Sequence, residues 1–234
     1  MVLDQTLLPS QERWVSLRTS DEVVEAIKKL RVRGAPLIGI AAAMGLQVAM
    51  SNEWDPSKEE FFTLFHRNVE KISASRPTAV NLQWALNRME KCAERYAAEA
   101  PEQILEHLKT EALAIKQYEE TTCDAIGKFG SALIADGMGI LTHCNAGALA
   151  TGHLGTALAP IYMAHQQGKR IKVFADETRP LLQGARLTAY ELMNNGIDTT
   201  LICDNMAASI MAKGWVQMIF VGCDRVATNG DTAN

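Results

Sequence analysis

The segment LTHCNAGALATGHLGT, residues Leu141–Thr156, begins as an apolar run, stops at the polar pair His-Cys (143–144) and continues in small residues. The segment VGCDRVATNGDTAN, residues Val221–Asn234, has the same order, with Cys-Asp (223–224) as its polar pair. In an open α/β sheet this boundary marks the carboxyl edge, where ligands and catalytic groups gather. The two segments therefore predict a sheet that places a thiol and a carboxylate at one crevice.

The region around these segments alternates between short β-rich runs and helical stretches. The predicted strands are 138–142, 171–175, 199–203 and 218–222, and the predicted helices are 147–167, 181–195 and 205–213. Crossovers of this length connect parallel strands, and such connections are right-handed. The second half of the chain is therefore predicted to be a doubly wound, Rossmann-like parallel sheet.

The first half has helical signals instead. Ser20 is a suitable cap for a helix over Asp21–Arg31, a second helix is expected from Ala35, and Pro77 and Pro101 suit the first position of two more. The change of character predicts two domains, a mainly helical one over residues 1–130 and the α/β domain over residues 131–234.

Composition excludes several classes of partner. A formal net charge of −4 for 234 residues provides no basic surface for nucleic acid or for an anionic membrane. The most apolar window, Ala35–Met50, is too short to span a bilayer and is expected to be a buried helix. The five cysteines contain no C-x-x-C pair and no signal peptide is visible, so a reducing cytoplasm is expected, without a thiolate metal site.

Cys144 is the first candidate for chemistry. The segment Asn145–Gly147 leads into a predicted helix, whose free N–H groups would lower the pKa of the thiol. The alternative is a buried cysteine that only packs at a strand end, because free cysteines are commonly buried. His143 and His153 are expected to support the site at most.

Asp224 is the second candidate. It ends a strongly apolar strand, where desolvation would raise its pKa toward the range useful for proton transfer, although it could instead cap the following turn. Asp204 is expected to cap a helix. Asp176 and Glu177 are weak candidates for a carboxylate pair, because adjacent residues of a strand point to opposite faces.

Two arginines precede predicted helix starts, in Arg33–Pro36 and in Arg76–Thr78. A guanidinium beside free backbone N–H groups can bind a phosphate, whereas an ordinary solvated arginine is the alternative. Neither segment is a Walker loop, and no G-x-G-x-x-G follows a strand, so nucleotide binding is not indicated.

Five segments together resemble the methylthioribose-1-phosphate isomerase family. They are RVRGAPLIGIAAAMGL, SRPTAVNL, LTHCNAGALATGHLGTAL, FADETRPLLQGARLTAYEL and VGCDRVATNGDTAN, and the resemblance runs from about residue 17 to residue 234. That family shares its fold with ribose-1,5-bisphosphate isomerases and with regulatory subunits of a translation-initiation exchange factor. Those subunits generally lack the cysteine and aspartate pair that this chain retains.

The resemblance implies roles for individual residues. Cys144 and Asp224 match the catalytic residues of the family. Its substrate-binding positions match Arg33, Gly34, Ala35, Arg76, Gln183 and Asn234. The implied protein is a cytoplasmic homodimer that needs no metal or organic cofactor. The family continues after residue 234 with a lysine and about a hundred further residues, so the chain resembles a truncated copy.

The implied reaction converts 5-methylthioribose 1-phosphate to 5-methylthioribulose 1-phosphate in methionine salvage. Either an enediol or a hydride shift would complete the isomerisation, and the residues leave both routes open. Two other functions also stay open. One is isomerisation of another sugar 1-phosphate, such as ribose 1,5-bisphosphate, and the other is a regulatory module that senses a sugar phosphate without turnover.

Overall fold

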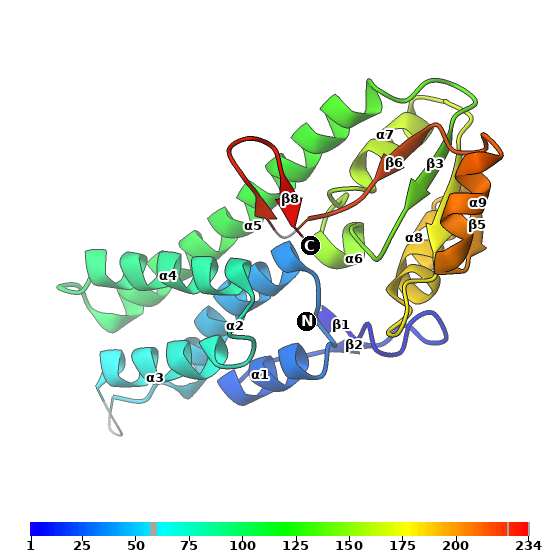
Figure 1. Cartoon of the computed structure of the whole chain (residues 1–234). Coiled ribbons are helices and arrows are strands. Elements are labelled where there is room, and N and C mark those ends of the chain that lie inside the picture. The colour runs from blue at the N-terminus through cyan, green and yellow to red at the C-terminus, as the bar shows by residue number, and fades with distance from the viewer. Residues whose placement is uncertain (57–59, 224, 234) are drawn as a thin grey trace. The chain divides into compact units, whose positions relative to one another are not determined.

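The computed structural model describes residues 1–56, 60–223 and 225–233, and the chain divides into two compact units, Met1–Glu119 and Glu120–Asn234 (Figure 1). Helix α5 (Pro101–Ser131) runs from the first unit into the second. The domain boundary that the sequence suggests near residue 130 stays a prediction.

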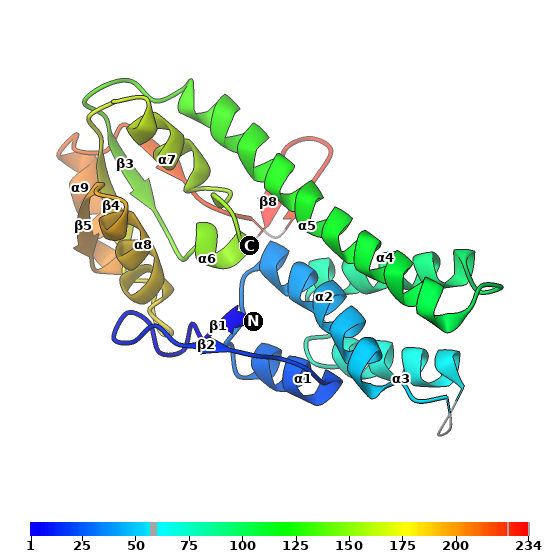
Figure 2. The same cartoon turned by 180° about the vertical axis from the view of Figure 1, so that it is seen from behind.

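The first unit is mainly helical. Its helices are α1 (Ser20–Lys28), α2 (Ala35–Glu53), α3 (Phe61–Ser73), α4 (Val80–Arg95) and the first part of α5, and a short antiparallel pair, β1 (Val2–Leu3) with β2 (Trp14–Val15), precedes them. Helix α2 supplies the centre of the core, because Ala42 and Leu46 are fully buried against the apolar sides of the other helices. Figure 2 shows α2 lying among α1, α3 and α4.

Helix α2 is longer than the sequence suggests. Its 19 residues make it long and apolar enough, by length and composition, to cross a membrane, so the expectation that the segment is too short is wrong. Half of that apolar window is buried inside the structure, and Ala42 and Leu46 within it belong to the core cluster of the first unit. The expectation of a buried helix is therefore confirmed.

The second unit contains the predicted parallel sheet. Its strands are β3 (Gly139–Thr142), β4 (Lys172–Asp176), β5 (Asp198–Ile202) and β6 (Met218–Phe220), in the order β5-β4-β3-β6, and every pair in this sheet is parallel. A short hairpin of β7 (Arg225–Val226) and β8 (Thr232–Ala233) follows.

Both faces of this sheet are covered, as a doubly wound fold requires. Successive residues of a strand point to opposite faces. Ile140 of β3 therefore packs in a cluster that includes Tyr162 of α7 (Ala159–Gln166) and Leu192 of α8 (Ala189–Asn194). Leu141 packs instead in a second cluster, which contains Ile210 of α9 (Ala207–Ala212). The predicted α/β fold class is confirmed.

Several predicted helix limits are wrong. Thr19 rather than Ser20 caps α1, in a capping box with Glu22, because the Thr19 hydroxyl accepts the Glu22 N–H. Pro77 does not begin a helix, since α4 begins at Val80 after a turn.

The helices of the sheet domain also differ from the prediction. The single helix expected over 147–167 is divided into α6 (Ala148–Thr151) and α7, because Gly152 and Gly155 have positive φ angles of 78° and 94°. The two helices expected over 181–195 and 205–213 each begin with a turn that is not α-helical. A wider π-helix over Gly184–Thr188 precedes α8, and a tighter 3₁₀-helix over Asp204–Met206 precedes α9.

Candidate active site

The carboxyl edge of the parallel sheet gathers polar residues from neighbouring strands. His143 and Cys144 follow β3, Asp176 ends β4, and Asp204 follows β5. Because all four strands are parallel, their carboxyl ends meet at the same edge. From β3 the chain adds β4 and then β5 on one side, and it then adds β6 on the other side of β3. The carboxyl end of β3 is therefore at the topological switch point, where open α/β sheets bind ligands.

Cys144 is held by its main chain in an uncommon conformation. Its φ angle is +60°, in the left-handed region that few residues other than glycine adopt. Its N–H donates to the hydroxyl oxygen Oγ1 of Thr178 over 2.8 Å, and its carbonyl accepts from the Thr188 hydroxyl over 2.5 Å. Strained backbone of this kind clusters at functional sites. The thiol is half-buried.

His143 is oriented by a buried carboxylate. Its Nδ1 lies 2.9 Å from Oδ2 of Asp176, which is only 5% exposed. Burial raises the pKa of Asp176 above its ordinary value, although the hydrogen bond and charge of His143 oppose this rise. Both residues are weak candidates by sequence pattern alone, although a histidine and an aspartate at the ends of adjacent strands are a usable signal.

Asp204 does not cap its own helix. Its two carboxylate oxygens accept the backbone N–H groups of Thr178 and Arg179, each over 2.8 Å. These hydrogen bonds lower the pKa of Asp204. The expected capping role is wrong, because the tip of β5 lies beside the loop that follows β4, and that loop has the nearer free N–H groups.

The same three side chains have the composition of a metal site. Ligand atoms of His143, Asp176 and Asp204 all lie within 4.8 Å of one another. However, His143 Nδ1 and Asp176 Oδ2 bond to each other, and both oxygens of Asp204 accept backbone N–H groups. In the described structure these atoms are engaged in hydrogen bonds to one another and to backbone N–H groups, so we describe the arrangement as a hydrogen-bond network.

A second buried carboxylate holds the loop after Cys144. Glu191 is 5% exposed and accepts from Asn145 Nδ2 over 2.5 Å, from the Ala148 N–H over 2.6 Å and from the Tyr162 hydroxyl over 3.1 Å. Burial raises the pKa of Glu191, and these hydrogen bonds oppose the rise. Burial and the neighbouring Glu191 raise the pKa of Tyr162, which keeps its hydroxyl a donor. Sequence reasoning missed this network.

Gln183 lies at the same edge of the sheet as Cys144. The next residue, Gly184, packs so closely on the end of β4 that an added Cβ would lie 2.9 Å from Oγ1 of Thr178, the atom that accepts the Cys144 N–H. The side-chain oxygen Oε1 of Gln183 is buried, and no described residue donates a hydrogen bond to it. A buried oxygen of this kind suits a ligand donor.

The end of β6 also lies beside the Cys144 loop. An added Cβ at Gly222 would lie 3.2 Å from Cβ of Ala146 and 3.9 Å from the hydroxyl oxygen of Thr156. Gly222, the residue before the second polar pair, therefore lies beside the loop that follows Cys144. Asp224 and Asn234, predicted as a catalytic and a substrate-binding residue, lie outside the described residues.

The remaining predicted residues belong to the first unit. Gly34 precedes α2 with a φ angle of 95°, Ala35 is the first residue of α2, and Arg33 comes directly before them. Arg76 lies four residues before the start of α4, farther from the helix than expected. Helices α2 and α4 approach closely near their N-terminal ends, because an added Cβ at Gly39 would lie 2.8 Å from the carbonyl oxygen of Asn81.

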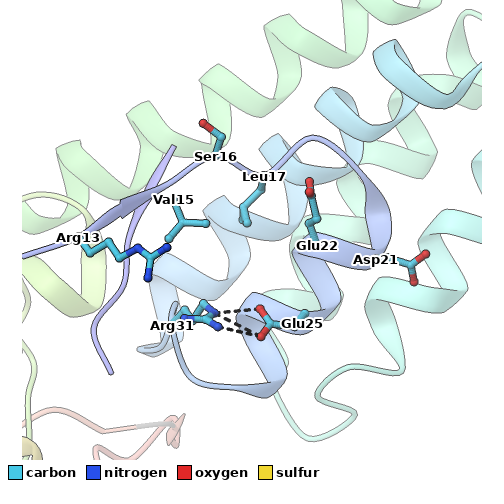
Figure 3. Close-up of a pocket in the computed structure, with 8 residues that line it drawn as sticks. All are labelled: Arg13, Val15, Ser16, Leu17, Asp21, Glu22, Glu25 and Arg31. Carbon is cyan, nitrogen blue, oxygen red and sulfur yellow. Dashed lines mark hydrogen bonds and ion pairs between the residues drawn. The ribbon is translucent and has the colours of Figure 1, made fainter. Parts of the chain in front are cut away.

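The first unit also has a hollow of about 400 Å³ near its N-terminus (Figure 3). Arg13 and Arg31 lie among its lining residues, together with three carboxylates. The guanidinium of Arg31 is hydrogen-bonded to Glu25, as Figure 3 shows, and also to Asp4, and both carboxylates raise its pKa. With that cation already paired and acidic groups around it, the hollow is poorly suited to a phosphate.

Comparison with known proteins identifies close relatives. The methylthioribose-1-phosphate isomerase of Symbiobacterium thermophilum is 55% identical over the whole chain, and the 5-deoxyribose 1-phosphate isomerase of Petrotoga mobilis is 52% identical. The crystal structure of 5-methylthioribose 1-phosphate isomerase from Pyrococcus horikoshii OT3 superposes on 99% of the chain with a TM-score of 0.91 and 42% identity.

These relatives are longer than the chain. It spans 65% of the Symbiobacterium protein, 67% of the Petrotoga protein and 65% of the Pyrococcus chain. Residues 31–234 also match the sequence family described as the Initiation factor 2 subunit family. The chain belongs to the Initiation factor 2 subunit family.

Proposed function

We propose that the protein is an aldose–ketose isomerase that converts 5-methylthioribose 1-phosphate to 5-methylthioribulose 1-phosphate, a step of methionine salvage. The observation that carries this proposal is the position of Cys144, a strained residue at the switch point of the sheet with both of its peptide groups hydrogen-bonded. Relatives with isomerase names at 52–55% identity support it.

The phosphorylated anomeric carbon makes ring opening the difficult step, because the sugar cannot open spontaneously to a free aldehyde. In our proposal Asp224 donates a proton to the ring oxygen as the bond between C1 and that oxygen breaks. The Cys144 thiolate takes the proton from C2, which leaves a C1–C2 double bond. Such proton transfers by positioned groups typically accelerate a reaction by about 10²–10⁴-fold.

The second half of the reaction returns both protons. The Cys144 thiol protonates C1, and the Asp224 carboxylate takes the proton of the C2 hydroxyl as the C2 carbonyl forms. The substrate and product are isomers, and both side chains end in their starting states. A direct hydride shift from C2 to C1 is the rival route, and deuterium at C2 distinguishes the two, because only the proton-transfer route exchanges the label with water.

We further propose that the substrate is bound by the residues that the family resemblance indicates, namely Arg33, Gly34, Ala35, Arg76, Gln183 and Asn234. A guanidinium beside free helix N–H groups suits the phosphate dianion. The buried oxygen Oε1 of Gln183, which accepts from no described residue, suits a sugar hydroxyl as donor. A homodimer in the cytoplasm completes the proposal, and light scattering after size-exclusion chromatography tests the dimer.

A substrate profile tests the function. The purified protein is given 5-methylthioribose 1-phosphate, 5-deoxyribose 1-phosphate or ribose 1,5-bisphosphate, and ketose formation is followed by phosphorus NMR. We expect the highest kcat/KM with the methylthio sugar. A preference for 5-deoxyribose 1-phosphate, the sugar named for the Petrotoga relative, would support the second candidate function. Binding without turnover of any of the three would instead indicate a sensing module.

A further inference from the structure

We infer that Thr178 is a positioning residue for Cys144, and that its hydroxyl sets the direction of the thiol by holding the Cys144 main chain. This inference rests on the proposed catalytic role of Cys144. Thr178 lies in the loop after β4, 34 residues from Cys144 in sequence, and its Oγ1 accepts the Cys144 N–H over 2.8 Å.

The hydroxyl of Thr178 is itself fixed in direction. Its oxygen accepts from Cys144, and its proton is donated to the carbonyl oxygen of Asp176 over 3.2 Å. Thr178 is 7% exposed, so water competes little for either bond. A buried N–H group without an acceptor destabilises the fold, because it has lost its hydrogen bonds to water. Loss of the Thr178 oxygen would therefore favour a different position of the Cys144 N–H.

The backbone of Thr178 is as strained as that of Cys144. Its φ angle is +60°, which is a genuine outlier for a β-branched residue. Strain of this kind persists only where the surroundings enforce it. Here Asp204 binds the N–H groups of Thr178 and Arg179, and the Thr178 carbonyl accepts from the Leu182 N–H over 2.8 Å.

Thr188 holds the other side of Cys144. Its hydroxyl donates to the Cys144 carbonyl over 2.5 Å, from the last residue of the π-helix (Gly184–Thr188). Isolated π-turns are frequent at functional sites. With the N–H and the carbonyl of Cys144 both held, the direction of its Cα–Cβ bond is set, and only rotation about that bond still moves the sulfur.

Two substitutions of Thr178 distinguish the effect of its hydroxyl from the effect of its side-chain shape. Thr178→Val keeps the β-branched shape and removes the acceptor, whereas Thr178→Ser keeps the acceptor. We expect Thr178→Val to lower kcat by roughly 10- to 100-fold with KM nearly unchanged, because misplacement of a reacting group by about 1 Å has that scale. Thr178→Ser should stay within about threefold of the wild type on the same reasoning. Thr199→Val, near the start of β5 at the opposite edge of the sheet, is the matched control.

A second readout does not depend on turnover. The rate at which iodoacetamide alkylates Cys144, followed by peptide mass spectrometry across pH, should change in Thr178→Val and be restored in Thr178→Ser. Equal rates and pH profiles in the wild type and Thr178→Val would overturn the inference, and so would Thr178→Ser as impaired as Thr178→Val. If no sugar phosphate is turned over, the proposed function fails, while this alkylation result still decides the positioning role.

A third measurement needs no variant, in case Thr178→Val does not fold by circular dichroism. In the wild-type protein the amide proton of Cys144 should exchange with solvent at least 100-fold more slowly than in an unstructured peptide, because it is bonded to a buried oxygen. Exchange at the rate of an unstructured peptide would overturn the inference.

Discussion

Nδ1 of His143 lies 2.9 Å from Oδ2 of Asp176, at the carboxyl ends of the neighbouring strands β3 and β4. The second oxygen of Asp176, Oδ1, is buried and accepts from no residue that the structure describes. Only one of the two carboxylate oxygens therefore has a hydrogen bond that stabilises the ionised form. The loss of hydration on burial outweighs this bond, which explains why the pKa of Asp176 is raised.

The raised pKa predicts how stability depends on pH. A carboxyl whose pKa is higher in the folded state favours folding below its unfolded value, 3.8, and this contribution is lost as the pH rises through the folded pKa. Asp176→Asn cannot ionise. The melting temperature of the wild type minus that of Asp176→Asn should therefore be larger at about pH 4 than at about pH 7.

Asp136 provides a control of opposite sign. It is exposed and hydrogen-bonded to Arg170, which lowers its pKa to about 2, so its contribution is lost only as the pH falls toward that value. The difference between the wild type and Asp136→Asn should stay constant between about pH 5 and pH 7. A difference for Asp176→Asn that is constant or grows with pH would contradict the assignment.

Loss of either proposed proton-transfer group should reduce turnover. Asp224→Asn should lower kcat by about two orders of magnitude or more, the usual scale of general acid–base catalysis, with KM nearly unchanged. Cys144→Ser should be similarly impaired, because a hydroxyl is a far weaker acid than a thiol. Steady-state kinetics with 5-methylthioribose 1-phosphate measures both. A fully active serine variant would return Cys144 to a packing role.

The two arginines of the first unit should act on affinity. Arg33→Ala or Arg76→Ala should weaken substrate binding by about 1.5–3 kcal/mol, the contribution of a hydrogen bond to a charged group. The defect should appear in KM or in the Kd of a substrate analogue measured by calorimetry, with a smaller effect on kcat. Arg95→Ala, in the last turn of α4, is a suitable control. Unchanged affinity in both variants would place the phosphate elsewhere.

The strands and the edge that they share could be predicted from the sequence, whereas the helix limits and the hydrogen-bond partners could not. The limits of β3 to β6 lie within two residues of the predicted limits, and β3 and β4 are the buried apolar runs that parallel strands commonly have. The division into α6 and α7 depends on Gly152 and Gly155 turning the chain back over Ala146, whose carbonyl accepts the Thr156 N–H over 2.9 Å. Local periodicity contains no information about such a return.

The same limit applies to the site. Cys144 could be identified from its place after a strand, but Thr178 and Thr188 lie 34 and 44 residues away and contact it only through the fold. Glu191 has an ordinary position in a helical pattern, and nothing local indicates that its carboxylate turns inward. Residues that support a candidate group through hydrogen bonds therefore need the structure, whereas a candidate group at a strand end can be proposed from sequence and its role stays a prediction.

Gly147 provides a test of the buried network under the Cys144 loop. An added Cβ at this position would lie 2.6 Å from Oε1 of Glu191, and that carboxylate cannot move without breaking its bonds to Asn145, Ala148 and Tyr162. Gly147→Ala should therefore lower the free energy of unfolding by about 1–3 kcal/mol, the usual cost of overpacking, in urea titrations followed by circular dichroism.

The matched control is Gly127→Ala in α5, where the added Cβ would meet the flexible end of Met163 at 2.9 Å. Alanine is also favoured over glycine inside a helix by about 1 kcal/mol, so this variant should be neutral or more stable. Both variants add a methyl group, so the difference between their free energies of unfolding reports how far Glu191 resists displacement. A Gly147→Ala variant as stable as Gly127→Ala would mean that Glu191 can move away freely, and that the loop after Cys144 is not held by its carboxylate.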